Sequence, residues 1–406
     1  MLNRPRVSAE FLRAWKLRLA LVLVTWLALE FTARAGLFAL RRVRNLTYDP
    51  VERSSLTAVY RDGLELLLTN QAMYTAYSAS LGWTIRPGGA SPPLYRANLQ
   101  GLRADREYAP TASGDTLRIA AFGDSFTHGD DVANSETWEV ALERALPKIE
   151  VLNFGVGAYG LDQAYLRWRE MGATFHPRVV LIGYMTEDIG RNVNVYRPFY
   201  YGPTRLPLAK PRFVLQSDEL VLEPNPASRI DDYRALLTDP GPVLRRFGEH
   251  DYYYAHEPRA SAWDHSPLVR LMKLTLHEIV DGPTEPIRAN VYNVNSEAFH
   301  VTTRLFDEFV REVRAQNATP LIVVFPNRID FHRQAEGRAP GHQPLLDDFV
   351  RKHHDFVDVL AAFPECQKPC DLEAIIPVHF TPAGNRVIGE YLARALRARG
   401  LDRPSP

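Results

Sequence analysis

The sequence predicts a three-layer α/β/α domain in which helices cover both faces of a doubly wound parallel sheet. Short apolar runs typical of buried strands alternate with helical patterns from about residue 113, and a long stretch without this alternation interrupts them. The five expected strands are residues 117–122, 151–154, 179–184, 321–325 and 356–359. Because ligands of such folds bind at the carboxyl ends of the strands, we expect the chemistry at that edge.

Two of the expected helices have recognisable start signals. Asn134 or Ser135 is expected to cap the helix that presents Trp138 and Leu142 on one face. Thr381 is expected as the N-cap of the last helix, because Pro382 at the first helical position suits a helix start.

The chain divides by pattern into a short N-terminal region, a lead-in, and a domain in two parts separated by an insertion. The expected boundaries are a cytoplasmic tail 1–16, an apolar segment 17–35, a stalk and lead-in 36–112, the first part of the domain 113–195, an inserted cap 196–297 and the second part 298–406.

The N-terminal apolar run, residues 19–29, follows five basic residues, a pattern that leaves the basic end in the cytoplasm. It is short for a membrane helix, which needs about 20 apolar residues. An uncleaved single-pass anchor in the inner membrane, with the domain outside the cytoplasm, is the favoured prediction. A cleaved signal peptide is the alternative, because Ala33-Arg34-Ala35 has the small-x-small form of a cleavage site.

The two cysteines, Cys366 and Cys370, lie four residues apart. In an oxidising compartment they can close a small disulfide loop, and in a reducing one they remain free thiols. The spacing leaves both states open.

Composition excludes several function classes. The 48 basic and 48 acidic residues balance, so there is no basic excess for nucleic-acid binding. No zinc-ligand spacing and no glycine-rich phosphate loop stands out, so neither a metal nor a cofactor is expected.

The sharpest motif is GDSFTHG, residues 123–129, directly after the first expected strand. A serine in such a glycine-bounded turn, here Ser125, can attack an acyl carbon while nearby backbone N–H groups hold the oxyanion. His379 lies on a loop just before the last helix and can accept the proton of the serine. An ordinary β–α turn and a solvated loop histidine are the alternatives, so the hypothesis depends on the pair.

Three blocks together resemble the SGNH/GDSL hydrolase superfamily: GDSFTHG, then VLNFGVGAYGLDQ at 151–163, then HFTPAGN at 379–385. The stretch NLQGLR at 98–103 resembles a membrane-anchored bacterial branch of it. The resemblance implies the flavodoxin-like SGNH fold, with Ser125 as nucleophile and His379 as base.

The resemblance also implies an oxyanion hole, with the backbone N–H of Ser125 as one donor. Ala158 stands where the family has a glycine donor, and it or Gly157 is expected to serve. Glu187 stands where the family has an asparagine side chain, and a carboxylate there repels an oxyanion unless it is protonated or turned away. Asn192 or Asn194 is the expected substitute donor.

The family's acid three residues before the histidine is replaced by Ile376. Asp371 and Glu373 are the expected acids for orienting His379, and a serine–histidine dyad is the alternative.

These features predict a serine-dependent acyl-ester hydrolase or O-acyltransferase that acts on a cell-envelope or exported glycan. A membrane partner that supplies the acyl group is expected if the protein is a transferase. The alternative is an inactive member that binds glycan or scaffolds an export complex, because Ala158, Glu187 and Ile376 depart from the family pattern.

Overall fold

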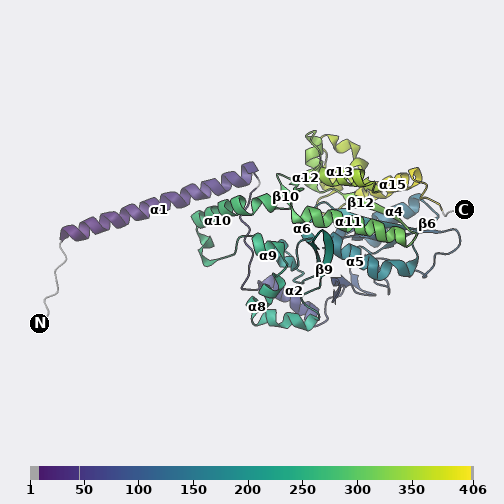
Figure 1. The fold of residues 1–406 in the computed structure, drawn as a ribbon, viewed down its shortest axis with the longest axis horizontal. Helices are drawn as coiled ribbons and strands as arrows, with labels where there is room; N and C mark the ends of the chain where they lie inside the picture. The colour runs from purple at the N-terminus through teal and green to yellow at the C-terminus, as the bar shows by residue number, and fades with distance from the viewer. Residues whose placement is uncertain (1–8, 45, 404–406) are drawn as a thin grey trace. The chain divides into compact units, whose positions relative to one another are not determined.

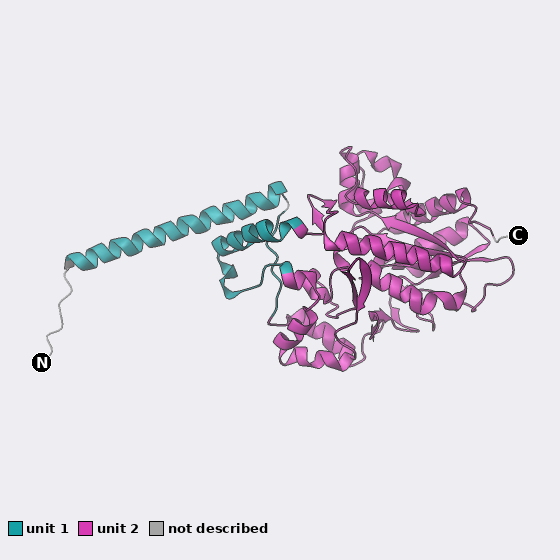
Figure 2. Ribbon diagram, viewed as in Figure 1, with its two compact units in different colours: residues 1–53, 256–283 teal, residues 54–255, 284–406 magenta. Residues whose placement is uncertain are grey.

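The computed structural model describes residues 9–44 and 46–403, which form two compact units (Figure 2). Unit 1 contains Met1–Arg53 and His256–Pro283, and unit 2 contains Ser54–Ala255 and Thr284–Pro406. The expected insertion 196–297 is therefore divided, because its middle part belongs with the N-terminal helix.

Unit 2 is built on a five-stranded parallel sheet with the order β13-β12-β7-β5-β6 (Figure 1). Its strands are β5 (Leu117–Phe122), β6 (Ile149–Asn153), β7 (Val179–Met185), β12 (Thr319–Phe325) and β13 (Phe356–Asp358). Each lies where a strand was predicted, and the predicted doubly wound fold is confirmed. The strand order reverses between β5 and β7, so the carboxyl ends of these two strands flank the expected ligand crevice.

Helices cover both faces of this sheet. On one face lie α4 (Trp138–Ala145) and α15 (Pro382–Ala398), which pack against each other. On the other lie α5 (Leu161–Met171), α11 (Glu297–Ala315) and α13 (Gln343–Lys352). The ring of Phe306 on α11 contacts Tyr184 of β7 and Phe349 of α13.

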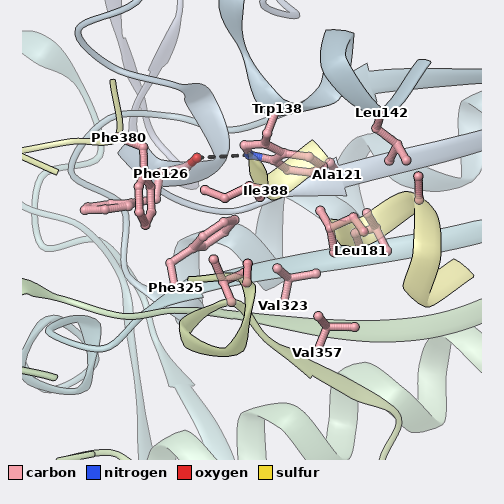
Figure 3. Close-up of a cluster of buried hydrophobic side chains, with 14 of the residues drawn as sticks. Ala121, Phe126, Trp138, Leu142, Leu181, Val323, Phe325, Val357, Phe380 and Ile388 are labelled. Atoms are coloured by element: carbon pink, nitrogen blue, oxygen red, sulfur yellow. Dashed lines mark hydrogen bonds between the residues drawn. The ribbon is translucent and has the colours of Figure 1, made fainter. Parts of the chain in front are cut away.

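Figure 3 shows the core between the sheet and the α4–α15 pair, where aliphatic side chains of the strands meet aromatic rings. Trp138 is at its centre, and its indole Nε1 donates to the carbonyl of Phe126 at 3.1 Å. A buried indole finds a partner in this way, and here the partner is the backbone of the turn that follows β5.

The start of α4 differs from the prediction. Thr137 holds its N-cap position, and Asn134–Glu136 form a separate 3₁₀ turn, so neither Asn134 nor Ser135 caps the helix. The Asn134 side chain is occupied elsewhere, since its amide donates to the carbonyl of Arg96 at 2.9 Å. The predicted cap of α15 is confirmed, because Thr381 Oγ1 accepts from Gly384 N at 3.2 Å.

The lead-in of unit 2 contains α2 (Ala58–Leu68) and two hairpins, β1 (Thr75–Ser78) with β2 (Gly82–Ile85) and β3 (Ala90–Ser91) with β4 (Tyr95–Arg96). Trp83 on β2 is 2% exposed and donates from Nε1 to the carbonyl of Gly157 at 3.0 Å. The lead-in is thus packed against the loop that follows β6.

Unit 2 has further short elements. They are α3 (Ser125–His128), α6 (Asp188–Arg191), α7 (Arg197–Tyr200), β8 (Arg212–Gln216), β9 (Glu219–Glu223), α8 (Pro240–Phe247), α9 (Tyr252–His256, at the unit boundary), β10 (Ile287–Arg288), β11 (Val291–Tyr292), α12 (Arg328–Ala335) and α14 (Leu372–Ile375). Just before α14, Cys366 and Cys370 are joined by a disulfide, which decides between the two states that the spacing left open.

Unit 1 consists mainly of α1 (Ala9–Arg44) and α10 (Pro267–Val280). Among the described residues, α1 is the one helix that is long and apolar enough to cross a membrane, and an 18-residue stretch within it has a mean hydropathy of 1.5. Length and composition are compatible with an anchor or with a signal sequence.

Gly389 sets how closely α15 approaches α4. A methyl group on Gly389 would lie 2.6 Å from the carbonyl oxygen of Trp138 and 2.8 Å from the backbone nitrogen of Leu142. We expect Gly389→Ala to destabilise the protein by about 1–3 kcal/mol, because rigid backbone must move aside. Thermal unfolding of the detergent-solubilised full chain measures this as a lower midpoint.

Gly241→Ala on α8 is the matched control, since the nearest atom to its added methyl is the flexible end of Arg245, at 3.7 Å. It should leave the midpoint unchanged or slightly raised. Equal effects of the two substitutions would contradict the packing argument.

Glu139, in the first turn of α4, is 2% exposed, and burial raises its pKa from 4.5 to about 8. The folded protein therefore keeps this carboxyl protonated while the unfolded chain ionises it above pH 4.5. The contribution of Glu139 to stability is present below pH 4.5 and is lost as the pH rises toward 8.

We expect Glu139→Gln to raise the unfolding midpoint relative to the unsubstituted chain by an amount that grows with pH. Unfolding scans of both proteins between pH 5 and pH 8 test this. A midpoint difference that does not change with pH would show that the folded protein already ionises the carboxyl in this range.

Candidate active site

The turn between β5 and α3 places Ser125 at the carboxyl end of β5. Asp124 caps α3 through a hydrogen bond from Phe126 N to Oδ1 at 2.8 Å, and Ser125 is the first residue of the helix. A methyl group on Gly123 would overlap Thr127 and lie 2.8 Å from the carbonyl oxygen of Gly183 on β7. Glycine is therefore needed here because β5 turns directly beside β7.

The loop before α15 meets this turn. His379 Nδ1 lies 2.7 Å from Asp131 Oδ2, and the His379 ring centroid lies 5.2 Å from that of Phe126, the residue after Ser125. The structure thus brings the two predicted residues, Ser125 and His379, to the same edge of the sheet. In the part of the chain that it describes, no hydrogen bond joins the serine hydroxyl to the imidazole.

Asn385 holds this loop in place. Its amide nitrogen donates to the carbonyl of Phe380 at 2.8 Å, and its side-chain oxygen accepts from Trp138 N at 3.1 Å. Because Trp138 also donates to the carbonyl of Phe126, α15, α4 and α3 are connected through buried hydrogen bonds.

Asp131, the carboxylate that contacts His379, was not predicted. It follows α3 in a left-handed conformation with φ 69°, and its N–H donates to the Tyr95 hydroxyl at 2.8 Å. The signal in the sequence was the pair Asp130-Asp131 directly after Gly129, the left-handed C-cap of α3. That turn directs a carboxylate back across the helix that carries Ser125.

The two predicted acids have other partners. Asp371 caps α14 by accepting from Glu373 N at 3.1 Å, and the Glu373 carboxylate pairs with Arg328 Nη1 at 2.7 Å. Neither is within hydrogen-bond distance of His379 among the described residues. Both acids are near His379 in the sequence, but α14 directs them elsewhere. Asp371 faces the backbone amides of α14, and Glu373 faces α12.

Arg103 fixes the loop that carries Asp131. It is 4% exposed, and its guanidinium donates to the carbonyl of His128 at 2.6 Å and to the carbonyls of Gly129 and Val132. The same group lies 4.7 Å from the centre of the Tyr95 ring. The planar fork of arginine is suited to holding several acceptors at once.

His128, within the serine motif, has a buried role. Its Nδ1 bonds Asp130, its Nε2 lies 2.6 Å from the Tyr74 hydroxyl, and burial lowers its pKa. Burial alone would raise the pKa of Asp130, but the neighbouring His128 makes it lower than usual. This pair packs beneath the turn, so His379 is the histidine at the exposed side.

The loop after β6 carries the predicted oxyanion donors. Asn153 connects it to the serine turn by donating from Nδ2 to the carbonyl of Thr127 at 2.9 Å, and Val156 N donates to the carbonyl of Gly123 at 3.0 Å. Ala158 has φ 68°, so alanine takes the left-handed conformation that a glycine would adopt without strain.

The backbone N–H groups of Ser125, Gly157 and Ala158 make no hydrogen bond within the described residues. A methyl group on Gly157 would lie 3.3 Å from Asp130 Oδ2, so Gly157 lies beside the loop that follows α3. These N–H groups are available to an oxyanion.

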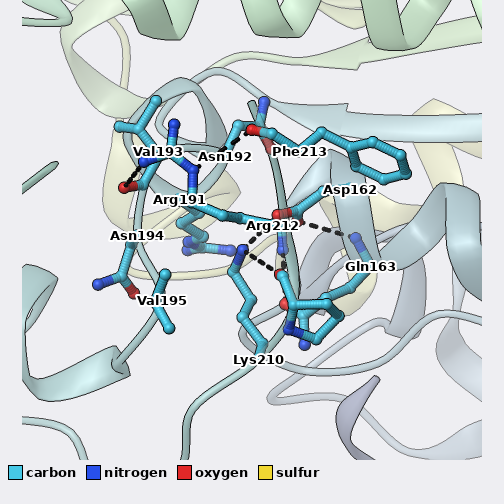
Figure 4. Close-up of polar contacts among 12 residues, drawn as sticks. Asp162, Gln163, Arg191, Asn192, Val193, Asn194, Val195, Lys210, Arg212 and Phe213 are labelled. Atoms are coloured by element: carbon cyan, nitrogen blue, oxygen red, sulfur yellow. Dashed lines mark hydrogen bonds and ion pairs between the residues drawn. The ribbon is translucent and has the colours of Figure 1, made fainter. Parts of the chain in front are cut away.

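The predicted side-chain donors are already engaged. Asn192 is fully buried, accepts from Leu161 N at 2.9 Å and donates to Thr302 Oγ1 at 2.8 Å. Asn194 donates to the carbonyl of Tyr196 and to Asp251, both at 2.8 Å. Figure 4 shows Asn192 and Asn194 among the polar contacts around the start of α5, where Lys210 pairs with Asp162. Both asparagines therefore stabilise loops.

Glu187, at the family's asparagine position, follows β7. Burial raises its pKa, which favours the neutral carboxyl. A neutral carboxyl removes the repulsion toward an oxyanion that a carboxylate would cause.

Behind Ser125 lies a buried group of charges. Arg191 Nη1 is 3.5 Å from Asp124 Oδ2 and 2.7 Å from Asp188 Oδ1, and burial raises the pKa of both aspartates. The guanidinium offsets the cost of burying carboxyl groups next to the serine turn.

No family model and no curated protein matches the chain. Solved structures do. The chain is similar to a member of the lipolytic protein G-D-S-L family from Veillonella parvula, at 11% identity and a TM-score of 0.34, over 70% of this chain and 100% of that one. It is similar to the lipase/acylhydrolase from Enterococcus faecalis, at 12% identity and a TM-score of 0.35, over 70% and 97%.

A third similar structure is an acetylxylan esterase from Geobacillus stearothermophilus, at 17% identity and a TM-score of 0.34, over 72% of this chain and 99% of that one. The solved structures that this chain resembles thus include a lipolytic protein of the G-D-S-L family, a lipase/acylhydrolase and an acetylxylan esterase.

Proposed function

We propose that the protein is a serine-dependent acyl-ester enzyme in which Ser125 is the nucleophile, His379 the general base and Asp131 the residue that positions His379. The observation that carries this proposal is the contact of 2.7 Å between His379 Nδ1 and Asp131 Oδ2, beside the turn that holds Ser125. A nucleophile, a base and a carboxylate behind the base are the parts that acyl transfer needs.

Asp131 determines which nitrogen of His379 acts. With Nδ1 bonded to the carboxylate, Nε2 is the nitrogen left to take the proton of the serine. The side chain of His379 is 19% exposed and that of Asp131 is 61% exposed, so the pair is accessible to a substrate.

The proposed reaction has two steps. Ser125 Oγ attacks the acyl carbon as its proton passes to His379, and the alcohol leaves with that proton, so that an acyl-serine remains. A water or a sugar hydroxyl then attacks the acyl-serine, gives its proton to His379, and the proton returns to Ser125 as the acyl group departs. Water makes the protein an esterase, and a sugar hydroxyl makes it an O-acyltransferase.

Backbone amides are the proposed oxyanion donors. The N–H groups of Ser125, Gly157 and Ala158 are available, whereas Asn192 is committed to Leu161 and Thr302. Preorganised N–H groups stabilise the tetrahedral intermediate without reorganising during the reaction. This hole would therefore work without the family's side-chain amide.

We further propose that the enzyme is anchored by α1 and acts outside the cytoplasm on a cell-envelope or exported glycan. The length and hydropathy of α1 support the anchor. The disulfide between Cys366 and Cys370 supports an oxidising compartment. The glycan follows from the resemblance of the sequence to anchored members of the superfamily.

A second candidate is an inactive protein that binds glycan. The observation that favours it is the missing side-chain donor, since Glu187 stands at that position and Asn192 is engaged. Activity measurements on the same variants separate the two.

Ser125→Ala tests the nucleophile. The full chain in detergent should react with a serine-directed fluorophosphonate and hydrolyse short-chain aryl esters, and Ser125→Ala should lose both reactions because no hydroxyl remains to attack. Labelling followed by peptide mapping identifies the modified residue. Folded protein that is neither labelled nor active would favour the glycan-binding candidate.

Asp131→Asn tests the positioning residue. We expect kcat to fall by on the order of 10²–10⁴ with little change in KM, because an amide does not stabilise the imidazolium. Asp131→Glu should restore part of the activity, and the pH profile of kcat/KM should shift in Asp131→Asn.

Glu373→Gln is the matched control, since it removes a carboxylate three positions from Ile376 that pairs with Arg328. It should retain activity. A large loss in Glu373→Gln with none in Asp131→Asn would assign the acid to the segment before His379.

A further inference from the structure

Helix α10 in unit 1 exposes an unusual apolar face. Met272 is 63%, Leu276 61%, Ile279 70% and Val280 61% exposed, and their spacing places them on one side of the helix. We call these four residues the α10 face. A contiguous apolar stripe of this kind marks a site of contact with a protein or a membrane.

The α10 face lies on a helix that packs along α1. A methyl group on Gly36 of α1 would be 3.4 Å from Leu271 Cδ2, and Glu30 of α1 contacts the first turn of α10. Because residue 30 meets residue 268 and residue 36 meets residue 271, the two helices run in the same direction. The α10 face is therefore carried alongside the second half of the candidate membrane helix.

The contact at Glu30 pairs the acidic residue that interrupts the apolar part of α1. The uncharged run 19–29 is too short to span a bilayer, and Glu30 interrupts it. Its carboxylate accepts from the Ser266 hydroxyl and from Leu268 N at 3.2 Å, so it is bound at the N-terminus of α10. The positive end of a helix stabilises a carboxylate, and a charge that is paired in this way is tolerated near lipid.

Aromatic and basic side chains gather at the same level. A pocket of about 500 Å³ is lined by Trp26, Phe31 and Arg34 of α1 and by Trp263 and His265, just before α10. Trp263 is 76% exposed.

Lys273, at the edge of the α10 face, has its charge satisfied within unit 1. Lys273 donates to Asp264 Oδ1 at 2.7 Å, to Ser261 Oγ at 2.9 Å and to the carbonyl of Arg259 at 2.8 Å. The ammonium group of Lys273 is thus turned toward the loop before α10, and the four residues of the α10 face are themselves uncharged.

We propose that α10 is a second membrane-inserted element, which lies against α1 with the α10 face among lipid acyl chains. Glu30, bound at the start of α10, marks the depth at which the two helices join. The occupant of the α10 face is the lipid bilayer, because the face continues the lipid-compatible surface of α1. This proposal does not depend on the enzymatic function.

Site-directed labelling of the full chain tests the proposal. Leu276→Cys and Ile279→Cys are each labelled with the fluorophore NBD and reconstituted into vesicles of phosphatidylcholine and phosphatidylglycerol. The two native cysteines are joined to each other and do not react. The matched control is Val350→Cys on α13, an aliphatic position in unit 2 that is 63% exposed.

We expect NBD at 276 and 279 to be quenched by doxyl-labelled lipids and protected from iodide, whereas NBD at 350 is quenched by iodide alone. Iodide quenching at 276 and 279 as strong as at 350 would overturn the proposal. Protection from iodide without quenching by doxyl lipids would also overturn it, because it would assign the α10 face to a protein partner such as a second copy of this chain. An unfolding midpoint equal to that of the unlabelled chain verifies that each variant is folded.

Discussion

The arrangement at the candidate site depends on one buried guanidinium. Arg103 holds the carbonyls of His128, Gly129 and Val132, and these bracket the two aspartates that follow α3. Without a cation to gather these acceptors, the loop would have to leave them unpaired in a buried place. The contact between Asp131 and His379 therefore rests on a residue of the lead-in, outside the sheet.

Packing on one face of the sheet brings the distant parts of the chain together. Gly389 lets α15 approach α4. Trp138 of α4 donates from its indole N–H to the carbonyl of Phe126 and from its backbone N–H to the side-chain oxygen of Asn385. The helix that begins after His379 is thereby fixed to the helix that begins at Ser125. The same contacts therefore stabilise the core and set the geometry of the site.

Several ionisable side chains next to the serine turn are buried. Asp124 and Asp188 share Arg191, and burial raises the pKa of both carboxyls and of Glu187. A raised pKa disfavours the ionised form of each carboxyl, and less negative charge at the carboxyl ends of β5 and β7 suits a reaction in which negative charge develops on an oxyanion. In unit 1 the Glu30 carboxylate is also paired, and its partner is the N-terminus of α10 rather than a cation.

The sequence alone determined the strands, the last helix and the placement of Ser125 and His379, because apolar runs, a Thr-Pro cap and glycine-bounded turns are local signals. It did not determine the partner of His379. Asp131 and Asp371 are equally polar in the sequence, and only the left-handed turn after α3 and the cap of α14 decide which one faces the imidazole. Likewise the sequence suggested Asn192 as a free donor, but in the structure its side-chain oxygen bonds Leu161 N and its side-chain nitrogen bonds Thr302 Oγ1. The tertiary structure decided these points because hydrogen-bond partners far apart in the chain are selected by packing.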